Sequence, residues 1–329
     1  MKTSMISFLC LLLLSSGIAF KLSDPLRLIQ TISLTGVEGR IDHLAYDAVH
    51  GRLFVAALGN NTVEVVDVKS GERIRSIKGF REPQGIAYLP KVNQICVASG
   101  QGTGIDFLDG TSYNILHSVP LGDDSDNVRY EAGTNEIAVG FGSGKLAFIE
   151  PVSRTVLWKI DLAGHPESFQ MEGTGSRTFV NVPTAGHIAV VDRKLRSIVS
   201  TWPIVAVKSN FPMALDESSH RLFVGCRNPA KTLVYDTLTG KVVANLYIVG
   251  DTDDLFYDEQ RKRLYISGGA GFVDVFQKKE GDQFDRISHL QTATGARTSL
   301  FVAKTRRLYL AIPHRGDQKA EIRVYELQD

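Results

Sequence analysis

The chain has 329 residues, 43% of them hydrophobic and 22% charged, with 37 Lys and Arg against 36 Asp and Glu. This balance indicates a globular protein with a substantial core, and it excludes disordered, collagen-like and disulfide-scaffold classes. The formal charge of +1 provides no overall basic field. We therefore expect no nucleic-acid partner and no electrostatic binding to a membrane surface.

Residues 1–19 have the pattern of a secretory signal peptide. Lys2 precedes the apolar run Ile6–Leu14, and residues 17–19 form a small-x-small cleavage site that ends at Ala19. The apolar stretch is shorter than the roughly 20 residues that a membrane-spanning helix needs. We therefore expect cleavage near Ala19 and a periplasmic or secreted protein that does not insert into the membrane.

The first strand expected after the leader is Leu28–Leu34. Its composition resembles that of Val156–Leu162 and Val242–Ile248, each of which closes a repeated four-strand unit further along the chain. The last unit reaches Asp329 without such a strand. We therefore expect residues 28–34 to supply the fourth strand of the last unit.

A repeat follows this strand and fills the rest of the chain. Its apolar triplets lie 42, 42, 41, 44, 42 and 44 residues apart. The triplets are Leu53–Val55, Ile95–Val97, Ile137–Val139, Thr178–Val180, Leu222–Val224, Leu264–Ile266 and Leu308–Leu310. Seven copies at one period indicate a repeat architecture, in which each copy is one supersecondary unit.

Each copy consists of strands, because its apolar residues alternate with polar ones or form short runs rich in β-branched and aromatic side chains. The first copy predicts strands at residues 42–46, 53–58, 63–68 and 73–77. A sheet of this size cannot bury both faces alone, whereas radial stacking buries each blade against its neighbours. The sequence therefore predicts an all-β fold: a seven-bladed β-propeller of four-stranded antiparallel blades, closed by the N-terminal strand in the last blade. Residues 20–329 form one domain.

The cysteines Cys96 and Cys226 fall in the second and fifth copies. A disulfide needs Cα atoms within about 7 Å, and these two copies lie on different sides of the predicted ring. We therefore expect two separate, buried thiols.

The first copy also resembles a known repeat. Residues 52–71, RLFVAALGNNTVEVVDVKSG, are similar to the YVTN β-propeller repeat, and residues 221–240 follow the same scheme. The third and fourth copies diverge, because Glu150 stands where Asp is usual and Lys194 replaces the turn glycine. The resemblance covers roughly residues 27–327. It implies a seven-bladed fold of the kind found in exported bacterial and surface-layer proteins, but it does not imply one activity.

The residues that open the inner strands are the candidate ligand-binding residues. In a propeller these segments lie on one face, around the mouth of the central channel, so their side chains can converge. The candidates are Arg40, Asp42, His43, Gln84, Asp126, Asn127, His165, Glu167, Asp253, Asp254 and Arg297. Polar residues at such positions also have a purely structural use, because they satisfy backbone groups in turns.

The charges of these residues predict the kind of ligand. Arg40, His43 and Arg297 are expected to form a basic sector, and residues 123–126 and 251–254 acidic ones. The hairpin Pro313–Ala320, with His187 and Arg227, is expected at the rim. Such a mouth suits a small polar ligand or a charged segment of an envelope protein. We therefore favour a binding or scaffold module over an enzyme, and no catalytic residue is assigned.

A metal-assisted hydrolase or lactonase is the alternative function. Asp126, Glu167 and Asp254 offer the oxygen ligands that divalent cations prefer, and His43 could assist them. The cofactor is unknown: a divalent cation is the candidate, but the absence of any cofactor is the favoured expectation. Carboxylates about 40 residues apart have no diagnostic spacing.

Overall fold

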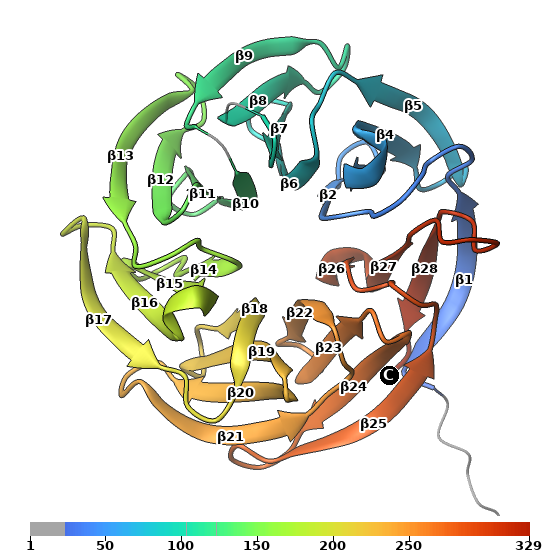
Figure 1. The fold of residues 1–329 in the computed structure, drawn as a ribbon. Helices are drawn as coiled ribbons and strands as arrows, with labels where there is room; N and C mark the ends of the chain where they lie inside the picture. Colours follow the sequence, from blue (N-terminus) through green and yellow to red (C-terminus); the bar gives the residue numbers. More distant parts are fainter. Residues whose placement is uncertain (1–23, 103, 123) are drawn as a thin grey trace, which may run out of the picture.

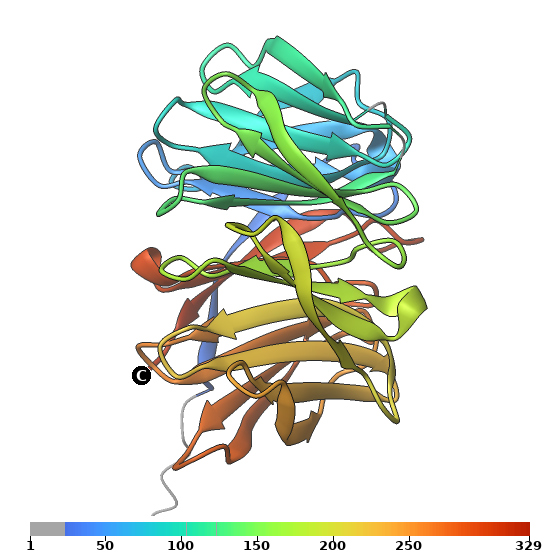
Figure 2. The ribbon, with the colours of Figure 1, turned by 90° about the vertical axis from the view of Figure 1, so that its left-hand side faces the viewer.

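The computed structural model describes residues 24–102, 104–122 and 124–329. Within these residues, seven four-stranded antiparallel sheets surround a central axis (Figure 1). The prediction of a seven-bladed β-propeller is therefore confirmed. Figure 2 views the ring from its side and shows the twisted sheets following one another around it. The predicted signal peptide lies outside the described residues.

Blades 1 to 4 follow the chain, and each runs from an inner strand at the axis to an outer strand. Blade 1 comprises β2 (Leu44–Asp47), β3 (Arg52–Ala57), β4 (Thr62–Asp67) and β5 (Glu72–Lys78). Blade 2 comprises β6 (Pro83–Leu89), β7 (Gln94–Ser99), β8 (Gly104–Asp109) and β9 (Ile115–Pro120). Blade 3 comprises β10 (Ser125–Glu131), β11 (Glu136–Phe141), β12 (Lys145–Glu150) and β13 (Thr155–Asp161). Blade 4 comprises β14 (Phe169–Met171), β15 (Arg177–Val182), β16 (His187–Asp192) and β17 (Ser197–Pro203).

Blades 5 to 7 complete the ring. Blade 5 comprises β18 (Lys208–Asp216), β19 (Arg221–Asn228), β20 (Ala230–Asp236) and β21 (Lys241–Tyr247). Blade 6 comprises β22 (Thr252–Asp258), β23 (Arg263–Gly268), β24 (Phe272–Lys278) and β25 (Phe284–Gln291). Blade 7 comprises β26 (Ser299–Val302), β27 (Arg307–Ile312), β28 (Glu321–Leu327) and β1 (Leu26–Ser33). Three short 3₁₀ turns, η1 (Leu58–Asn60), η2 (Pro183–Ala185) and η3 (Ala303–Thr305), connect strands.

The ring is closed by the first described strand. In Figure 1 the blue β1 lies outside the red β28, and the two pair antiparallel with Ile32 opposite Ile322. Ile32 is fully buried in a cluster that also contains Leu53 of blade 1 and Tyr309 of blade 7. β1 therefore completes the last blade and contributes to its interface with the first, as predicted.

The blades pack face to face, which explains their continuous apolar runs. Every residue of β3 is buried, because both faces of blade 1 are covered by neighbouring blades. No residue of β5 is buried, since the outer strand faces solvent. Radial position therefore determines the pattern of each strand.

The turn before each outer strand has a geometry that recurs along the chain. Asp67 accepts hydrogen bonds from the backbone N–H groups of residues 69 and 70, and Asp192 and Asp236 form the same arrangement. Gly71 and Gly240, four residues after their Asp, adopt a left-handed φ of 74° and 69°. In blade 4 the equivalent residue is Arg196, with φ of 53°, so the prediction that Lys194 replaces the turn glycine was wrong by two positions.

Cys96 and Cys226 are both buried and unbridged, in β7 and β19, as predicted. In the part of the chain that the structure describes, no helix has the length and hydropathy to cross a membrane.

Candidate functional site

A polar cavity of about 260 Å³ opens at one end of the central channel. We call it the mouth pocket. Ten of the eleven predicted residues line it, and they come from every blade except the fifth. These ten residues are Arg40, Asp42, His43, Gln84, Asp126, Asn127, His165, Glu167, Asp253 and Arg297. Their convergence agrees with the prediction, whereas ligand binding by them stays a prediction.

A recurring backbone irregularity lies beside four of these residues, Gln84, Asp126, Asn127 and Asp253. Glu82, Asp124, Ser209 and Asp251 lie at or next to the start of inner strands in blades 2, 3, 5 and 6, and all have a left-handed φ between 52° and 61°. The pairing register of each of these inner strands then shifts within its first residues, as in a β-bulge. Bulges redirect side chains and are common next to functional sites.

Asp254 is the one predicted residue that does not line the mouth pocket. It accepts the backbone N–H of Ser299 at 2.8 Å and faces His43 Nδ1 at 3.6 Å, in a second cavity deeper in the channel. Asp253, its neighbour, points into the mouth pocket instead. Asp254 is therefore not placed to join Asp126 and Glu167 around one cation, and His165 takes that place.

The charges of the mouth pocket are interleaved, not separated into sectors as predicted. Arg297 contacts Asp251 at 2.9 Å and Asp253 at 3.4 Å. Arg227 contacts the same two carboxylates, and Arg40 forms an ion pair with Asp42. Each arginine of the pocket thus has a carboxylate partner, so the expected basic sector does not exist as a free positive surface.

Four residues of the lining are absent from the predicted set: Asp124, Ser168, Phe211 and Arg227. Arg227 comes from the end of β19, the second strand of its blade, and it lies 3.9 Å from the ring centroid of Phe211. Because the prediction considered only the segments that open inner strands, Arg227 was expected at the rim and not in the lining. The hairpin 313–320 and His187 do not line the pocket; His314 instead pairs with Glu38 at 2.7 Å.

His43 occupies the junction between the mouth pocket and the deeper cavity. Its ring lies between Asp42, 3.6 Å from Nε2, and Asp254, 3.6 Å from Nδ1. Burial lowers the pKa of His43, but the two carboxylates, Asp254 foremost, raise it to about 10. The imidazole is therefore a cation at neutral pH, and it lies between two carboxyl groups.

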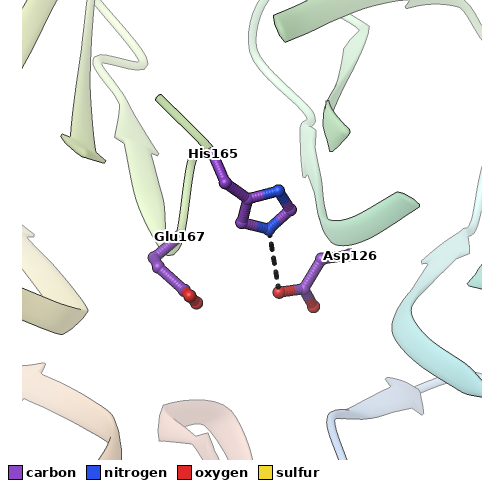
Figure 3. Close-up of side chains that lie close together, drawn as sticks. All are labelled: Asp126, His165 and Glu167. Carbon is purple, nitrogen blue, oxygen red and sulfur yellow. Dashed lines mark ion pairs between the residues drawn. The ribbon is translucent and has the colours of Figure 1, made fainter. Parts of the chain in front are cut away.

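Asp126, His165 and Glu167 form a compact cluster on the wall made by blades 3 and 4 (Figure 3). One carboxylate oxygen of each acid and one nitrogen of His165 lie within 4.8 Å of one another. His165 Nδ1 lies 2.6 Å from the Gly142 carbonyl oxygen, so this nitrogen donates to the backbone. Nε2 consequently faces Asp126, at 3.7 Å, with its ring orientation fixed.

The electrostatics of this cluster differ from those of the rest of the pocket. Among the described residues, no Lys or Arg nitrogen lies within 4.0 Å of the carboxylates of Asp126 or Glu167. Burial, with the charges of Asp126 and Asp253, raises the pKa of Glu167 to about 8. Burial lowers the pKa of His165, but Asp126 and the Gly142 carbonyl raise it to about 9.

Solved structures resemble the chain closely in fold and hardly at all in sequence. The RRP9 WD40 repeats match with a TM-score of 0.80 at 11% identity, covering 92% of this chain and 100% of that one. U3-55K matches with a TM-score of 0.79 at 11% identity, covering 90% and 98%. A chain of the mitotic checkpoint complex matches with a TM-score of 0.76 at 12% identity, covering 100% of both.

The fold is a WD40-like seven-bladed propeller. No family model matches the sequence, and no curated protein does. At such low identity the likeness to these structures concerns the fold alone. The function must therefore be argued from the mouth pocket itself.

Proposed function

We propose that this protein is a binding module that holds a divalent cation at Asp126, His165 and Glu167 and, through it, a small polar ligand in the mouth pocket. The observation that carries the proposal is the convergence of one imidazole nitrogen and two carboxylate oxygens within 4.8 Å. Atoms this close to one another can share a single cation, because two ligands bound at about 2.4 Å lie no more than about 4.8 Å apart.

The charge distribution supports a cation at this place. The three arginines of the pocket already pair with Asp42, Asp251 and Asp253. Two further carboxylates lie side by side without such a partner, which is unfavourable unless a proton or a cation intervenes. The raised pKa of Glu167 expresses the same repulsion and the cost of burial.

The surroundings of the cluster support a coordination site. A histidine that binds a metal through one nitrogen usually donates its other N–H to a carbonyl or carboxylate, and His165 does so to Gly142. Asn127, which is 2% exposed, lines the same pocket, and its Oδ1 accepts no hydrogen bond from the described residues. This buried amide oxygen is a further donor of the type that divalent cations accept.

A mixed nitrogen and oxygen donor set favours Mn²⁺ or Zn²⁺ over Ca²⁺ and Mg²⁺. The polar ligand would then complete the coordination of the cation and contact the arginine–aspartate pairs opposite. The ligand class is a small molecule that carries oxygen donors, or the charged segment of an envelope protein. The proposal includes two predictions from the sequence. The protein is exported to the periplasm or the exterior, as the leader predicts, and it is a member of the YVTN-type propellers.

We expect Mn²⁺ and Zn²⁺ to raise the melting temperature of the EDTA-treated protein, because a ligand that binds the native state stabilises it by about 2.7 kcal/mol at 100 times its dissociation constant. The shift should be several degrees for a chain of this size. Mn²⁺ should bind at least about tenfold more tightly at pH 8.5 than at pH 6.5, since Glu167 and His165 Nε2 must lose protons with pKa values of about 8 and 9. Thermal unfolding with Mn²⁺, Zn²⁺, Ca²⁺ and Mg²⁺ at both pH values is the measurement. Unchanged melting temperatures with all four cations would remove the proposal.

Metal-assisted hydrolysis is the second candidate function, and the same cluster favours it. Three protein donors leave coordination positions open for water and substrate, and a bound cation lowers the pKa of its water. Release of acid from simple esters and lactones by the Mn²⁺-loaded protein distinguishes an enzyme from a binding module. Binding of the cation without turnover supports the binding role.

A further inference from the structure

A second cavity, of about 380 Å³, continues the channel beyond the mouth pocket. We call it the inner chamber. Its lining residues follow those of the mouth pocket along the same inner strands, as Ile86 and Tyr88 follow Gln84 on β6. His43 and Ser168 line both cavities and mark the boundary between them. The chamber is therefore a separate compartment on the axis, nearer to the opposite face of the ring.

Arg129, on β10, brings a positive charge into the inner chamber. Its guanidinium donates to the Val128 carbonyl at 3.0 Å and to Ser168 Oγ at 3.3 Å. Among the described residues, no Asp or Glu oxygen lies within 4.0 Å of it, in contrast to the arginines of the mouth pocket. Both of these hydrogen-bond partners are neutral oxygens. Among the described residues, the Arg129 guanidinium therefore has no carboxylate in contact with it.

The other charges around Arg129 balance one another. Arg40 pairs with Asp42, and the cationic His43 faces Asp254. Burial lowers the pKa of Arg129, and the more distant Asp254 and Asp126 raise it. A guanidinium nevertheless stays protonated in proteins, so one unit of positive charge is left over in the chamber. Arg129 is partly buried, and a charge that has lost part of its contact with water is stabilised by an opposite charge close to it.

Most of the residues that line the chamber are aromatic or aliphatic, and polar side chains such as Gln170 and Ser299 lie between them. Tyr88 and Tyr130 line it, and their hydroxyl groups donate to Asn93 and Asn135 at 2.9 Å. Phe256 from blade 6 also lines the chamber. A cavity of this volume lies in the range of small-molecule sites, in which apolar walls hold the body of a ligand and a few polar groups orient it.

We propose that the inner chamber binds a small aromatic monocarboxylate, whose carboxylate pairs with the Arg129 guanidinium and whose ring packs among the tyrosines. The guanidinium fork matches the geometry of a carboxylate, which a point charge does not. The Ser168 hydroxyl, which already contacts Arg129, is placed to donate to the same carboxylate. This site does not depend on the cation site of the mouth pocket.

Isothermal titration with benzoate, benzyl alcohol and acetate tests the site. We expect benzoate to bind at least tenfold more tightly than the other two, because it alone combines the charge with the ring. Arg129→Gln should weaken benzoate binding at least tenfold, and Arg129→Lys should weaken it less. Arg75→Gln on the outer strand β5, where Arg75 is exposed, is the matched control and should leave binding unchanged.

Each outcome decides the matter. Undetectable binding of benzoate by the wild-type protein, or equal binding by Arg129→Gln and wild type, overturns the proposal. Equal affinity for acetate and benzoate would show a simple anion site and would overturn the aromatic specificity. Glu167→Gln should retain benzoate binding, so that failure of the cation site and failure of this site can be told apart. Thermal unfolding of each variant shows whether it folds.

Discussion

The variant Glu167→Gln should lose Mn²⁺ affinity by about 100-fold or more. Glutamine keeps the shape of the side chain but removes the charge that attracts the cation, and the cluster then retains only Asp126 and His165 as strong donors. Loss of an outer partner of a metal ligand already costs 10–100-fold in affinity, and loss of a ligand should cost at least as much. Isothermal titration of the EDTA-treated protein at pH 8.5 measures the effect.

Glu82→Gln is the matched control for this experiment. Glu82 opens the inner strand of blade 2 on the same face, but it lies outside the lining of the mouth pocket and contacts Gln101. Its replacement should leave Mn²⁺ affinity unchanged. Equal affinities of Glu167→Gln and wild type would place the cation elsewhere. The unliganded Glu167→Gln variant should also be no less stable than wild type, because the removed carboxylate is buried beside Asp126.

The second large effect concerns closure of the ring. Replacing Ile32 by alanine should lower the free energy of unfolding by about 2–5 kcal/mol, the usual cost of truncating a buried isoleucine. Ile32 is fully buried at the interface of blades 7 and 1. Its truncation therefore leaves a cavity that exposed side chains cannot fill. Urea denaturation measures the change.

Leu28→Ala on the same strand is the control. Leu28 is 49% exposed, and its truncation should change the free energy of unfolding by no more than about 0.5 kcal/mol. Similar small effects of both substitutions would show that β1 contributes little to the stability of the ring, and they would contradict its role in closure.

The sequence was sufficient to predict the ring, because the pattern of apolar residues that buried strands require repeats seven times. Each blade is apolar on both faces where its neighbours cover it, and the turn before the outer strand uses an Asp that accepts backbone N–H groups in blades 1, 2, 4 and 5. Closure was also predictable, since Leu28–Leu34 resembles the outer strands of other blades, and β1 does pair with β28. The turn of blade 4 was misplaced because Arg196, like Tyr113 and Arg154 in the turns of blades 2 and 3, adopts the left-handed conformation that glycine adopts in blades 1 and 5.

The sequence was sufficient to predict which residues surround the channel mouth, but not how deep in the channel each side chain lies. Which residues open the inner strands follows from the repeat, but how far each side chain lies along the axis depends on irregularities in the pairing. The register shift between Thr252 and Asp254 sends Asp253 into the mouth pocket and leaves Asp254 in the inner chamber. Asp254, a predicted metal ligand, therefore lies apart from Asp126 and Glu167, and His165 completes their cluster instead.

The pairing of charges could not be derived from the sequence either. Arg227 and Arg297 share Asp251 and Asp253, although they come from the second strand of blade 5 and the link before blade 7. Only the radial arrangement shows that these arginines pair with carboxylates and that, among the described residues, Asp126 and Glu167 have no arginine partner. The unneutralised Arg129, which opens no strand, could not be distinguished in the sequence from any other strand arginine.

Anomalous diffraction from crystals of the EDTA-treated protein soaked in Mn²⁺ tests the central claim most directly. We expect one strong peak in the mouth pocket, about 2.0–2.4 Å from a carboxylate oxygen of Asp126, a carboxylate oxygen of Glu167 and Nε2 of His165. A pocket without anomalous density, with manganese bound only at the outer surface, would contradict the cation site and the binding function built on it.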